Sequence, residues 1–316
     1  MSAKPIANQD QHRVAVIGLG SMGFGIATSL RRAGHLVTGC DAVAASSDRF
    51  KADGGMAAAT PKEAVADAAI VISVVVNAAQ TETILFGPDG CAEWMAKGSV
   101  FISCATMAPE AARNIAASVE AKGLLYLDAP ISGGALRAAE GKLTVLASGS
   151  AEAFRSARPA LDAMSAKLYE LGDAPGAGAA FKMINQLLAG VHIAAAAEAI
   201  AFAARQGLDL KRVYEVITAS AGNSWMFENR VPHVLEGDYS PKSAVEIFTK
   251  DLGIVIDMAR AEKFPVPIAG AALQMFLMTA AAGMSRDDDI SVARLYARIT
   301  GTPLPGQDPK STKIMN

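Results

Sequence analysis

Cysteine, histidine, aromatic and charged residues are all scarce in this chain of 316 residues, which is 6% aromatic and 19% charged. The three cysteines, Cys40, Cys91 and Cys104, are odd in number and scattered, which argues against a disulfide framework and favours a reducing cytoplasm. The four histidines show no metal-ligand spacing, so we expect no metal site. The net charge is -2, and no basic cluster interleaved with aromatic residues occurs, so we expect no nucleic-acid partner.

Long apolar runs that would indicate export or membrane insertion are also few. Residues 1–12 are polar and contain no apolar core, so no secretion signal is expected. Residues 267–284 carry no charge, but they include Pro267, Gly270 and Gln274 and are rich in alanine. A buried or subunit-interface helix explains this stretch better than a membrane span, and we expect no membrane association.

A glycine-rich turn follows the first apolar stretch of the chain. Val14–Ile17 predicts a β-strand, and the pattern after the turn predicts an amphipathic helix. Strand, tight turn and helix in this order are typical of a dinucleotide-binding unit, in which the helix N-terminus receives the pyrophosphate. A plain strand–helix turn is the alternative. The turn comprises Gly18, Leu19, Gly20, Ser21, Met22 and Gly23.

An acidic residue ends the second predicted strand, 36–41. Asp41 lies 18 positions after Gly23, close to where a dinucleotide-binding unit places its acceptor for the ribose 2′-hydroxyl. A carboxylate there repels a 2′-phosphate, so Asp41 favours NAD over NADP. Arg49 lies nearby and leaves the cofactor preference open, and Asp41 could instead start an ordinary turn.

Strand and helix patterns alternate as far as residue 172, which predicts a parallel, doubly wound sheet. A breaker cluster at 172–178 follows, and nearly all later segments are helical in pattern. We therefore predict a Rossmann-like α/β domain at 1–174 and an all-α domain at 175–316. The Ala-rich run 179–206 is expected to be a central buried helix or a subunit interface. Further helices are expected at about 210–220, 243–261, 266–282 and 289–299.

The segment Asp128–Gly134 follows another predicted strand and contains Ser132, Gly133 and Gly134. Such a turn can present a hydroxyl and backbone N–H groups to a carboxylate. Taken alone, a Ser-Gly-Gly turn is more often only a loop. This segment is therefore a candidate binding site for an anionic substrate.

Lys182 and Asn185 lie three residues apart near the start of the long apolar helix, so they share one face, and Gln186 lies within reach of it. A lysine desolvated in apolar surroundings loses its proton more easily, which suits a general acid or base. The alternative is a lysine whose charged end extends to solvent. Two weaker candidates are the pair Lys250-Asp251, for which a solvated surface is the default, and the polar and aromatic loop 223–226.

Four motifs in order resemble the β-hydroxyacid dehydrogenase family, over about residues 12–300. The turn at 18–23 is similar to the family's cofactor signature, and the segment at 128–134 is similar to its substrate-binding signature. Gly178 through Lys182 to Asn185 resembles the catalytic signature, and Lys250-Asp251 resembles a lysine–aspartate cofactor motif.

The resemblance implies an NAD-dependent enzyme that acts on a small hydroxyacid or sugar acid and assembles as a homodimer or homotetramer. It implies that Lys182 is the catalytic acid–base, that Ser132, Gly133 and Gly134 hold the substrate carboxylate, and that Asn185 orients the substrate hydroxyls. It also implies that the nicotinamide half of the cofactor is bordered by Asn77, Thr106 and Lys250.

Within the family, segments 75–80 and 182–192 are most similar to the subgroup that oxidises the C2 hydroxyl of L-threonate. The alternatives are the 3-hydroxyisobutyrate and tartronate semialdehyde enzymes, which share every motif. The chain departs from many members at Val76, where proline is common, at Ser103, where an acidic residue is common, and at Gln186, where some have a second asparagine. We expect Asn185 to position the substrate, with Gln186 able to share that role.

Overall fold

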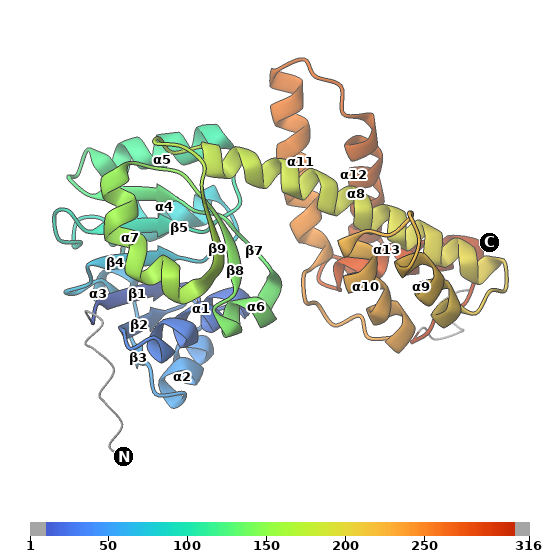
Figure 1. The fold of residues 1–316 in the computed structure, drawn as a ribbon, viewed down its shortest axis with the longest axis horizontal. Helices are drawn as coiled ribbons and strands as arrows, with labels where there is room; N and C mark the ends of the chain where they lie inside the picture. Colours follow the sequence, from blue (N-terminus) through green and yellow to red (C-terminus); the bar gives the residue numbers. More distant parts are fainter. Residues whose placement is uncertain (1–10, 307–316) are drawn as a thin grey trace. The chain divides into compact units, whose positions relative to one another are not determined.

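The computed structural model describes residues 11–306. The chain divides into two compact units, 1–182 and 183–316. The first unit is built on a parallel sheet of six strands in the order β3-β2-β1-β4-β5-β6 (Figure 1). Because the strand order runs outward in both directions from β1, the sheet is doubly wound, as predicted. The strands are β1 (Arg13–Ile17), β2 (Leu36–Cys40), β3 (Met56–Ala57), β4 (Ile70–Ser73), β5 (Val100–Ser103) and β6 (Leu125–Asp128).

The register aligns the carboxyl ends of five strands at one edge of this sheet. Ile17 pairs with Cys40 on one side and with Ser73 on the other, and Ser73 pairs in turn with Ser103. Ser103 then pairs with Asp128 at the end of β6. Ligands of open α/β sheets bind outside this edge, so a ligand site is expected among the segments that follow these strands.

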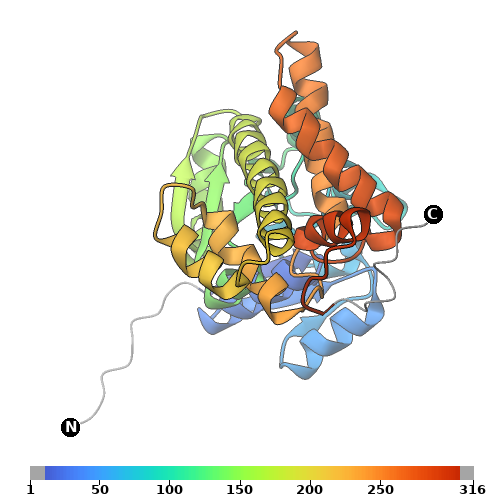
Figure 2. The same ribbon diagram turned by 90° about the vertical axis from the view of Figure 1, so that its right-hand side faces the viewer.

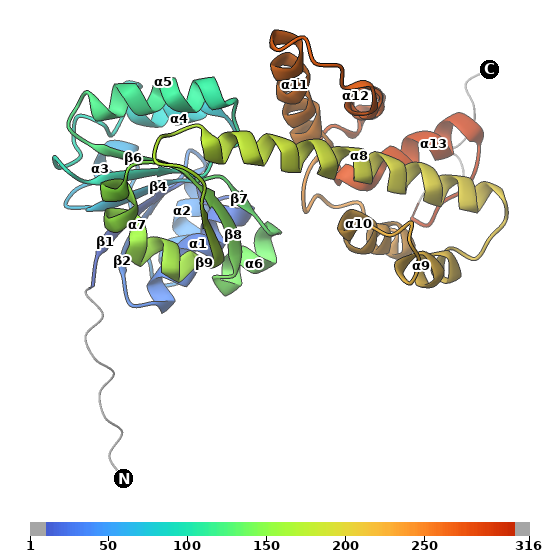
Figure 3. The ribbon, with the colours of Figure 1, turned by 45° about the horizontal axis from the view of Figure 1, so that its top comes forward.

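Helices cover both faces of the parallel sheet, which explains why its strands are continuous apolar runs. Figure 3 shows α4 and α5 along one face and α1 and α7 along the other. The buried clusters agree, because α1 and α7 share a core with one side of the strands, and α3, α4 and α5 share a core with the other. The helices of this unit are α1 (Ser21–Arg32), α2 (Ala44–Ala52), α3 (Pro61–Ala64), α4 (Ala78–Phe86), α5 (Pro109–Glu120), α6 (Gly134–Glu140) and α7 (Ala151–Met164).

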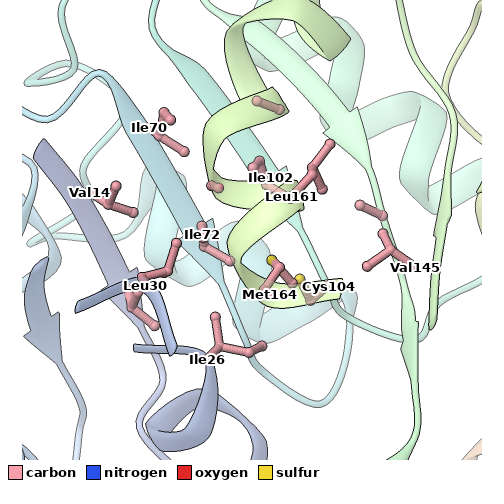
Figure 4. Close-up of a cluster of buried hydrophobic side chains, with 14 of the residues drawn as sticks. Val14, Ile26, Leu30, Ile70, Ile72, Ile102, Cys104, Val145, Leu161 and Met164 are labelled. Atoms are coloured by element: carbon pink, nitrogen blue, oxygen red, sulfur yellow. The ribbon is translucent and has the colours of Figure 1, made fainter. Parts of the chain in front are cut away.

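The core between α1, α7 and the sheet consists of close-packed aliphatic and sulfur-containing side chains (Figure 4). Ile26 and Leu30 of α1 and Leu161 and Met164 of α7 are inaccessible to solvent, and they face strand residues such as Ile72. Close packing of this kind fixes α1 relative to β1. It therefore fixes the glycine turn that joins them.

The last three strands of the unit form a separate sheet in the order β7-β8-β9. The alternating pattern of the sequence did not indicate this second sheet or its first strand, β7 (Ile131–Ser132), which pairs antiparallel with β8 (Leu143–Ala147). The third strand, β9 (Ser165–Glu170), pairs parallel with β8. Two residues are too few to show a strand periodicity, which is why the sequence suggested only a loop at β7.

The second unit is helical, as predicted, and its helices share one apolar core. The helix α8 (Ala177–Arg205), 29 residues long, begins in the first unit and continues into the second. In Figure 2, α11 and α12 run side by side, with the chain turning between them. The other elements of this unit are α9 (Leu210–Thr218), α10 (Trp225–Glu236), α11 (Val245–Ala261), α12 (Pro267–Thr279), a π-helical turn at Ala280–Met284, a 3-10 turn at Asp289–Ser291 and α13 (Val292–Thr300).

The helix α10 was missed at the sequence level, where residues 223–226 were interpreted as a loop. The helix begins after Ser224, whose hydroxyl accepts a hydrogen bond from the backbone N–H of Phe227. Pro232 lies inside the helix, and a proline at an internal position normally indicates a helix end. The N-terminal cap residue, Ser224, is visible in the sequence, but Pro232 argued against a helix that continues beyond it.

Two helices are long and apolar enough to cross a membrane by length and composition alone: Ala177–Arg205 and Pro267–Met284. Half of the most apolar window of the first is buried inside the protein. Core helices of soluble proteins pass the same test, so the absence of a membrane partner stays a prediction. The division between the compact units falls after Lys182, and the domain boundary expected after residue 174 likewise stays a prediction.

All three cysteines are buried free thiols. Burial raises the pKa of Cys40 to about 11 and the pKa values of Cys91 and Cys104 to about 12. Because a thiolate is the reactive form, these residues remain inert at neutral pH. The chemistry of this chain must therefore come from other side chains.

Candidate active site

The glycine turn between β1 and α1 has three glycines with three different surroundings. Gly18 has a φ of +96°, and a Cβ atom there would collide with the carbonyl oxygen of Val74. A Cβ atom at Gly23 would collide with the carbonyl oxygen of Gly18, so Gly23 permits the close contact of helix and turn. Gly20 differs, because a Cβ atom there would meet no protein atom within 4 Å.

The open space beside Gly20 leaves room for a ligand at the turn. Its φ of -64° and ψ of -163° are accessible to any residue, so its backbone does not require glycine. The helix α1 begins at the next residue, Ser21, with no side-chain cap and no acidic residue in its first turn. An anion there would be stabilised by the helix dipole and the N-terminal N–H groups. The turn therefore fits a cofactor pyrophosphate.

Asp41 lies beside the glycine turn, at the carboxyl end of β2. One carboxylate oxygen accepts the backbone N–H of Leu19 at 2.6 Å, and the other accepts the N–H of Val43 at 2.7 Å. The side chain is therefore held between the two loops where an adenosine ribose is expected. The guanidinium of Arg49 lies 4.0 Å from the centre of the Phe24 ring. Arg49 therefore contacts Phe24, and the assignment of Asp41 to a ribose hydroxyl stays a prediction.

Asn77 and Thr106 follow β4 and β5 at the same sheet edge. Asn77 caps the N-terminus of α4, because its side-chain oxygen accepts the backbone N–H of Gln80 at 2.9 Å. The side-chain oxygen of Gln80 accepts the backbone N–H of Val76 at 2.8 Å. Asn77 and Thr106 are both half-buried. Both residues therefore lie at the carboxyl edge of the sheet, and their contact with a cofactor stays a prediction.

The Ser-Gly-Gly segment spans the end of β7 and the start of α6. Ser132 is half-buried and pairs with Thr144 of β8. Gly133 and Gly134 have φ values of +139° and +77°, a backbone region that side chains rarely adopt. The two glycines are therefore needed for the shape of this turn. Their backbone N–H groups and the Ser132 hydroxyl are the groups that could receive a carboxylate.

Lys182 lies next to this turn. Its side chain is buried, with 7% exposure, and its Nζ donates a hydrogen bond to the carbonyl oxygen of Ile131 at 2.9 Å. Ile131 immediately precedes Ser132 in β7. The alternative of a lysine that extends to solvent is therefore wrong. The structure brings together the predicted acid–base and the predicted carboxylate-binding turn, which are 48 to 50 residues apart in the sequence.

A buried carboxylate anchors the start of α8, the helix that carries Lys182. Asp128, at the end of β6, is 1% exposed and accepts the backbone N–H groups of Gly176 at 3.0 Å and Ala179 at 2.8 Å. The hydroxyl of Ser148 donates to the same oxygen at 3.3 Å and accepts the N–H of Gly178 at 2.9 Å. Burial raises the pKa of Asp128, and these hydrogen bonds oppose the rise.

This anchor gives Asp128 a role that sequence reasoning missed. The side chain belongs to the predicted substrate-binding signature, but its partners lie about 50 residues later. At Gly178, a Cβ atom would collide with the carbonyl oxygen of Leu146, so only glycine lets the helix start contact the strands. Because the first turn of α8 is fixed, the position of Lys182 one turn later is fixed as well.

Lys250 and Asp251 lie on α11 in the second unit. Their side chains form an ion pair at 2.6 Å, and Asp251 is 1% exposed. The default expectation of a solvated pair is therefore wrong for Asp251. A carboxylate buried to this degree requires compensating partners. The residue types of this pair were evident from the sequence, but the burial of Asp251 was not.

Two family models match the chain, one after the other. Residues 13–172 match the NAD binding domain of 6-phosphogluconate dehydrogenase. Residues 176–296 match a model described as NAD-binding of NADP-dependent 3-hydroxyisobutyrate dehydrogenase. The matches fall on the two regions that the sequence distinguished as α/β and helical.

Named relatives and a solved structure are similar over nearly the full length. The L-threonate dehydrogenase of Cupriavidus necator is 52% identical over 93% of this chain and 98% of the relative. The enzyme of the same name from Escherichia coli K12 is 47% identical over 94% and 97%. A crystal structure of 3-hydroxyisobutyrate dehydrogenase from Salmonella typhimurium has a TM-score of 0.87 and 48% identity, covering 90% of this chain and 100% of that one.

These likenesses confirm the predicted fold, the NAD cofactor and the oxidoreductase class. The chain belongs to the 3-hydroxyisobutyrate dehydrogenase family of NAD-dependent hydroxyacid dehydrogenases.

Proposed function

We propose that this enzyme oxidises L-threonate at its C2 hydroxyl with NAD, giving 2-oxo-tetronate (2-dehydro-L-erythronate). The observation that carries the chemistry is the buried Lys182, whose Nζ lies 2.9 Å from the carbonyl oxygen of Ile131, beside the Ser-Gly-Gly turn. The choice of substrate is supported by the names of relatives at 47–52% identity. The site residues and their roles below are parts of the same proposal.

The substrate carboxylate is held by the hydroxyl of Ser132 and the backbone N–H groups of Gly133 and Gly134. This assignment is supported by the left-handed backbone of the two glycines, which shapes the turn, and by the amine of Lys182 next to it. A turn that presents a hydroxyl and N–H donors suits an anionic substrate, although the whole chain carries a net charge of -2.

Lys182 accepts the proton of the C2 hydroxyl during oxidation. Bound NAD supplies the hydride acceptor, and the protein supplies orientation and charge. In the reverse direction the Lys182 ammonium donates a proton to the oxygen as the carbonyl is reduced. The hydrogen bond to Ile131 keeps Nζ in place during proton transfer, so the geometry does not have to reorganise.

The cofactor is held by the first unit. Gly18–Gly23 and the N-terminus of α1 receive the pyrophosphate, and Asp41 accepts a hydrogen bond from the adenosine ribose. The open space at Gly20 and the position of Asp41 beside Leu19 support these roles. For Asn77 and Thr106, which are assigned to the border of the nicotinamide, the support is their place at the sheet edge and the resemblance.

Asn185 and Lys250 belong to the second unit. Asn185 is proposed to orient the substrate hydroxyls, and Lys250 is proposed to border the nicotinamide. Their support is the similarity of their motifs to the family signatures. We also propose a homodimer or homotetramer, because α8 exposes large apolar side chains in the single chain, among them Ile184 at 61% and Phe202 at 64%. We further propose a cytoplasmic location, which the three free cysteines favour.

The substrate assignment predicts a clear order of preference. Purified enzyme with NAD should form NADH fastest, by kcat/KM, from L-threonate when compared with D-threonate, 3-hydroxyisobutyrate and glycerate. The reaction is followed by NADH absorbance at matched substrate concentrations. The runner-up substrate is 3-hydroxyisobutyrate, which the name of the Salmonella structure favours. A preference for 3-hydroxyisobutyrate or glycerate would contradict the L-threonate assignment and leave the role of Lys182 intact.

A further inference from the structure

Four polar side chains of the second unit form one continuous chain of contacts. Asn185 Nδ2 donates to Gln186 Oε1 at 2.9 Å, and Gln186 Nε2 donates to Asp251 Oδ2 at 2.5 Å. The other oxygen of Asp251, Oδ1, pairs with Lys250 Nζ at 2.6 Å. The two central members are buried, Gln186 at 7% exposure and Asp251 at 1%, whereas Asn185 is exposed.

The charge of Asp251 determines the direction of every hydrogen bond in this chain. An ionised carboxylate only accepts, so Gln186 must turn its NH2 group toward Asp251. The side-chain oxygen of Gln186 then faces Asn185, which must turn its own NH2 group toward Gln186. The amide atom of Asn185 outside this chain of hydrogen bonds is its oxygen, Oδ1. The buried carboxylate thus specifies that Asn185 presents Oδ1 as an acceptor, beside the second N–H of its NH2 group.

We propose that Asp251 and Gln186 are positioning residues that fix the amide of Asn185, so that Oδ1 accepts a hydrogen bond from a substrate hydroxyl beyond C2. The inference rests on the proposed function, which assigns Asn185 to the substrate hydroxyls. The enzyme then selects polyhydroxy acids over 2-hydroxy acids that lack the further hydroxyl groups. A site that orients an acceptor for a substrate hydroxyl discriminates against analogues that lack it, because the acceptor is left unpaired.

Gln186 has the length that this arrangement requires. Gln186 and Asp251 are 65 positions apart on α8 and α11, and the contact between them spans the gap between the two helices. An asparagine at 186, as in some relatives of the family, would be one methylene shorter. Asp251 also holds Lys250, so one carboxylate supports both the substrate-orienting amide and the lysine assigned to the cofactor.

The test uses the full-length enzyme and two substrates, L-threonate and 2-hydroxybutanoate of the same C2 configuration, which lacks the hydroxyls at C3 and C4. Gln186→Met fills a similar volume but can neither donate a hydrogen bond to Asp251 nor accept one from Asn185. We expect kcat/KM for L-threonate to fall about 10- to 100-fold and that for 2-hydroxybutanoate to change less than about threefold. The dissociation constant of NAD, from fluorescence titration, should stay within about twofold.

Asp251→Asn is the second variant, because a neutral amide can reverse the direction of the hydrogen bonds. It should show the same loss of selectivity and, in addition, weaker NAD binding, since Lys250 loses its charged partner. Asp257→Asn is the matched control: it removes an exposed carboxylate from the same helix, and selectivity should remain unchanged. Circular dichroism and thermal melts establish that each variant is folded.

The outcomes separate the two proposals. If kcat/KM changed by the same factor for both substrates in the folded Gln186→Met enzyme, the positioning role would be overturned while the proposed reaction stands. A wild-type enzyme that oxidises L-threonate no better than 2-hydroxybutanoate would overturn the proposed substrate, and the hydroxyl selectivity inferred here would be overturned with it.

Discussion

Replacing Lys182 with methionine is expected to lower kcat for L-threonate roughly 10²- to 10⁴-fold, the usual contribution of general acid–base catalysis. Methionine keeps the apolar stem of the side chain and removes the amine that is hydrogen-bonded to Ile131. The measurement is steady-state NADH formation at saturating substrate and cofactor.

NAD binding and a control variant distinguish a loss of catalysis from a loss of structure. The dissociation constant of NAD should stay nearly unchanged, because the glycine turn and Asp41 are remote from Lys182 in the sequence and are held by other contacts. Lys211→Met, at an exposed position on α9, controls for the loss of one lysine. If the folded Lys182→Met enzyme kept kcat within about fivefold of the wild type, the acid–base role would be wrong.

Two alanine substitutions in the glycine turn are expected to have different effects, one on NAD affinity and the other on the stability of the fold. Gly20→Ala adds a methyl group to open space at an ordinary backbone conformation, so the melting temperature should hardly change. The same methyl group occupies the space assigned to the pyrophosphate. If it removes one or two charge-assisted hydrogen bonds, NAD affinity should fall about 10- to 100-fold.

Gly23→Ala should instead destabilise the fold, because its Cβ atom would collide with the carbonyl oxygen of Gly18 inside the packed turn. Overpacking of this kind costs about 1–3 kcal/mol or more. Thermal melts and NAD titration of the two variants form the comparison. A stable Gly20→Ala protein that binds NAD as tightly as the wild type would show that the open space at Gly20 is not where the cofactor lies.

The parts of the fold and site that the sequence predicted are those with local signals. The strand, glycine turn and helix occupy 20 consecutive residues, 13–32, so their order is visible in one local stretch of sequence. The central strands β1, β4 and β5 are apolar on both faces, so they were visible as continuous runs. The strand β3 was not predicted, because it is only two residues long and exposed. Asp41 could be predicted because parallel strands end at one edge, which places the end of β2 beside the turn after β1.

The parts that were missed depend on contacts between distant segments. Asp128 accepts hydrogen bonds from residues about 50 positions later, and Gln186 donates to Asp251, 65 positions later. Neither pairing has a sequence spacing that a helix or strand period could reveal. The burial of Asp251 could not be predicted from the sequence either. Lys250-Asp251 has the composition of a surface pair, and only the packing of α11 encloses the carboxylate of Asp251.

In the proposed reaction, hydride leaves C2 of L-threonate as Lys182 takes the hydroxyl proton. The most direct measurement uses L-threonate deuterated at C2, with the reduced cofactor and the product identified by mass spectrometry. We expect one deuterium in each reduced cofactor and a 2-oxo acid without deuterium at C2. Unlabelled NADH, or a product oxidised at another carbon, would contradict it.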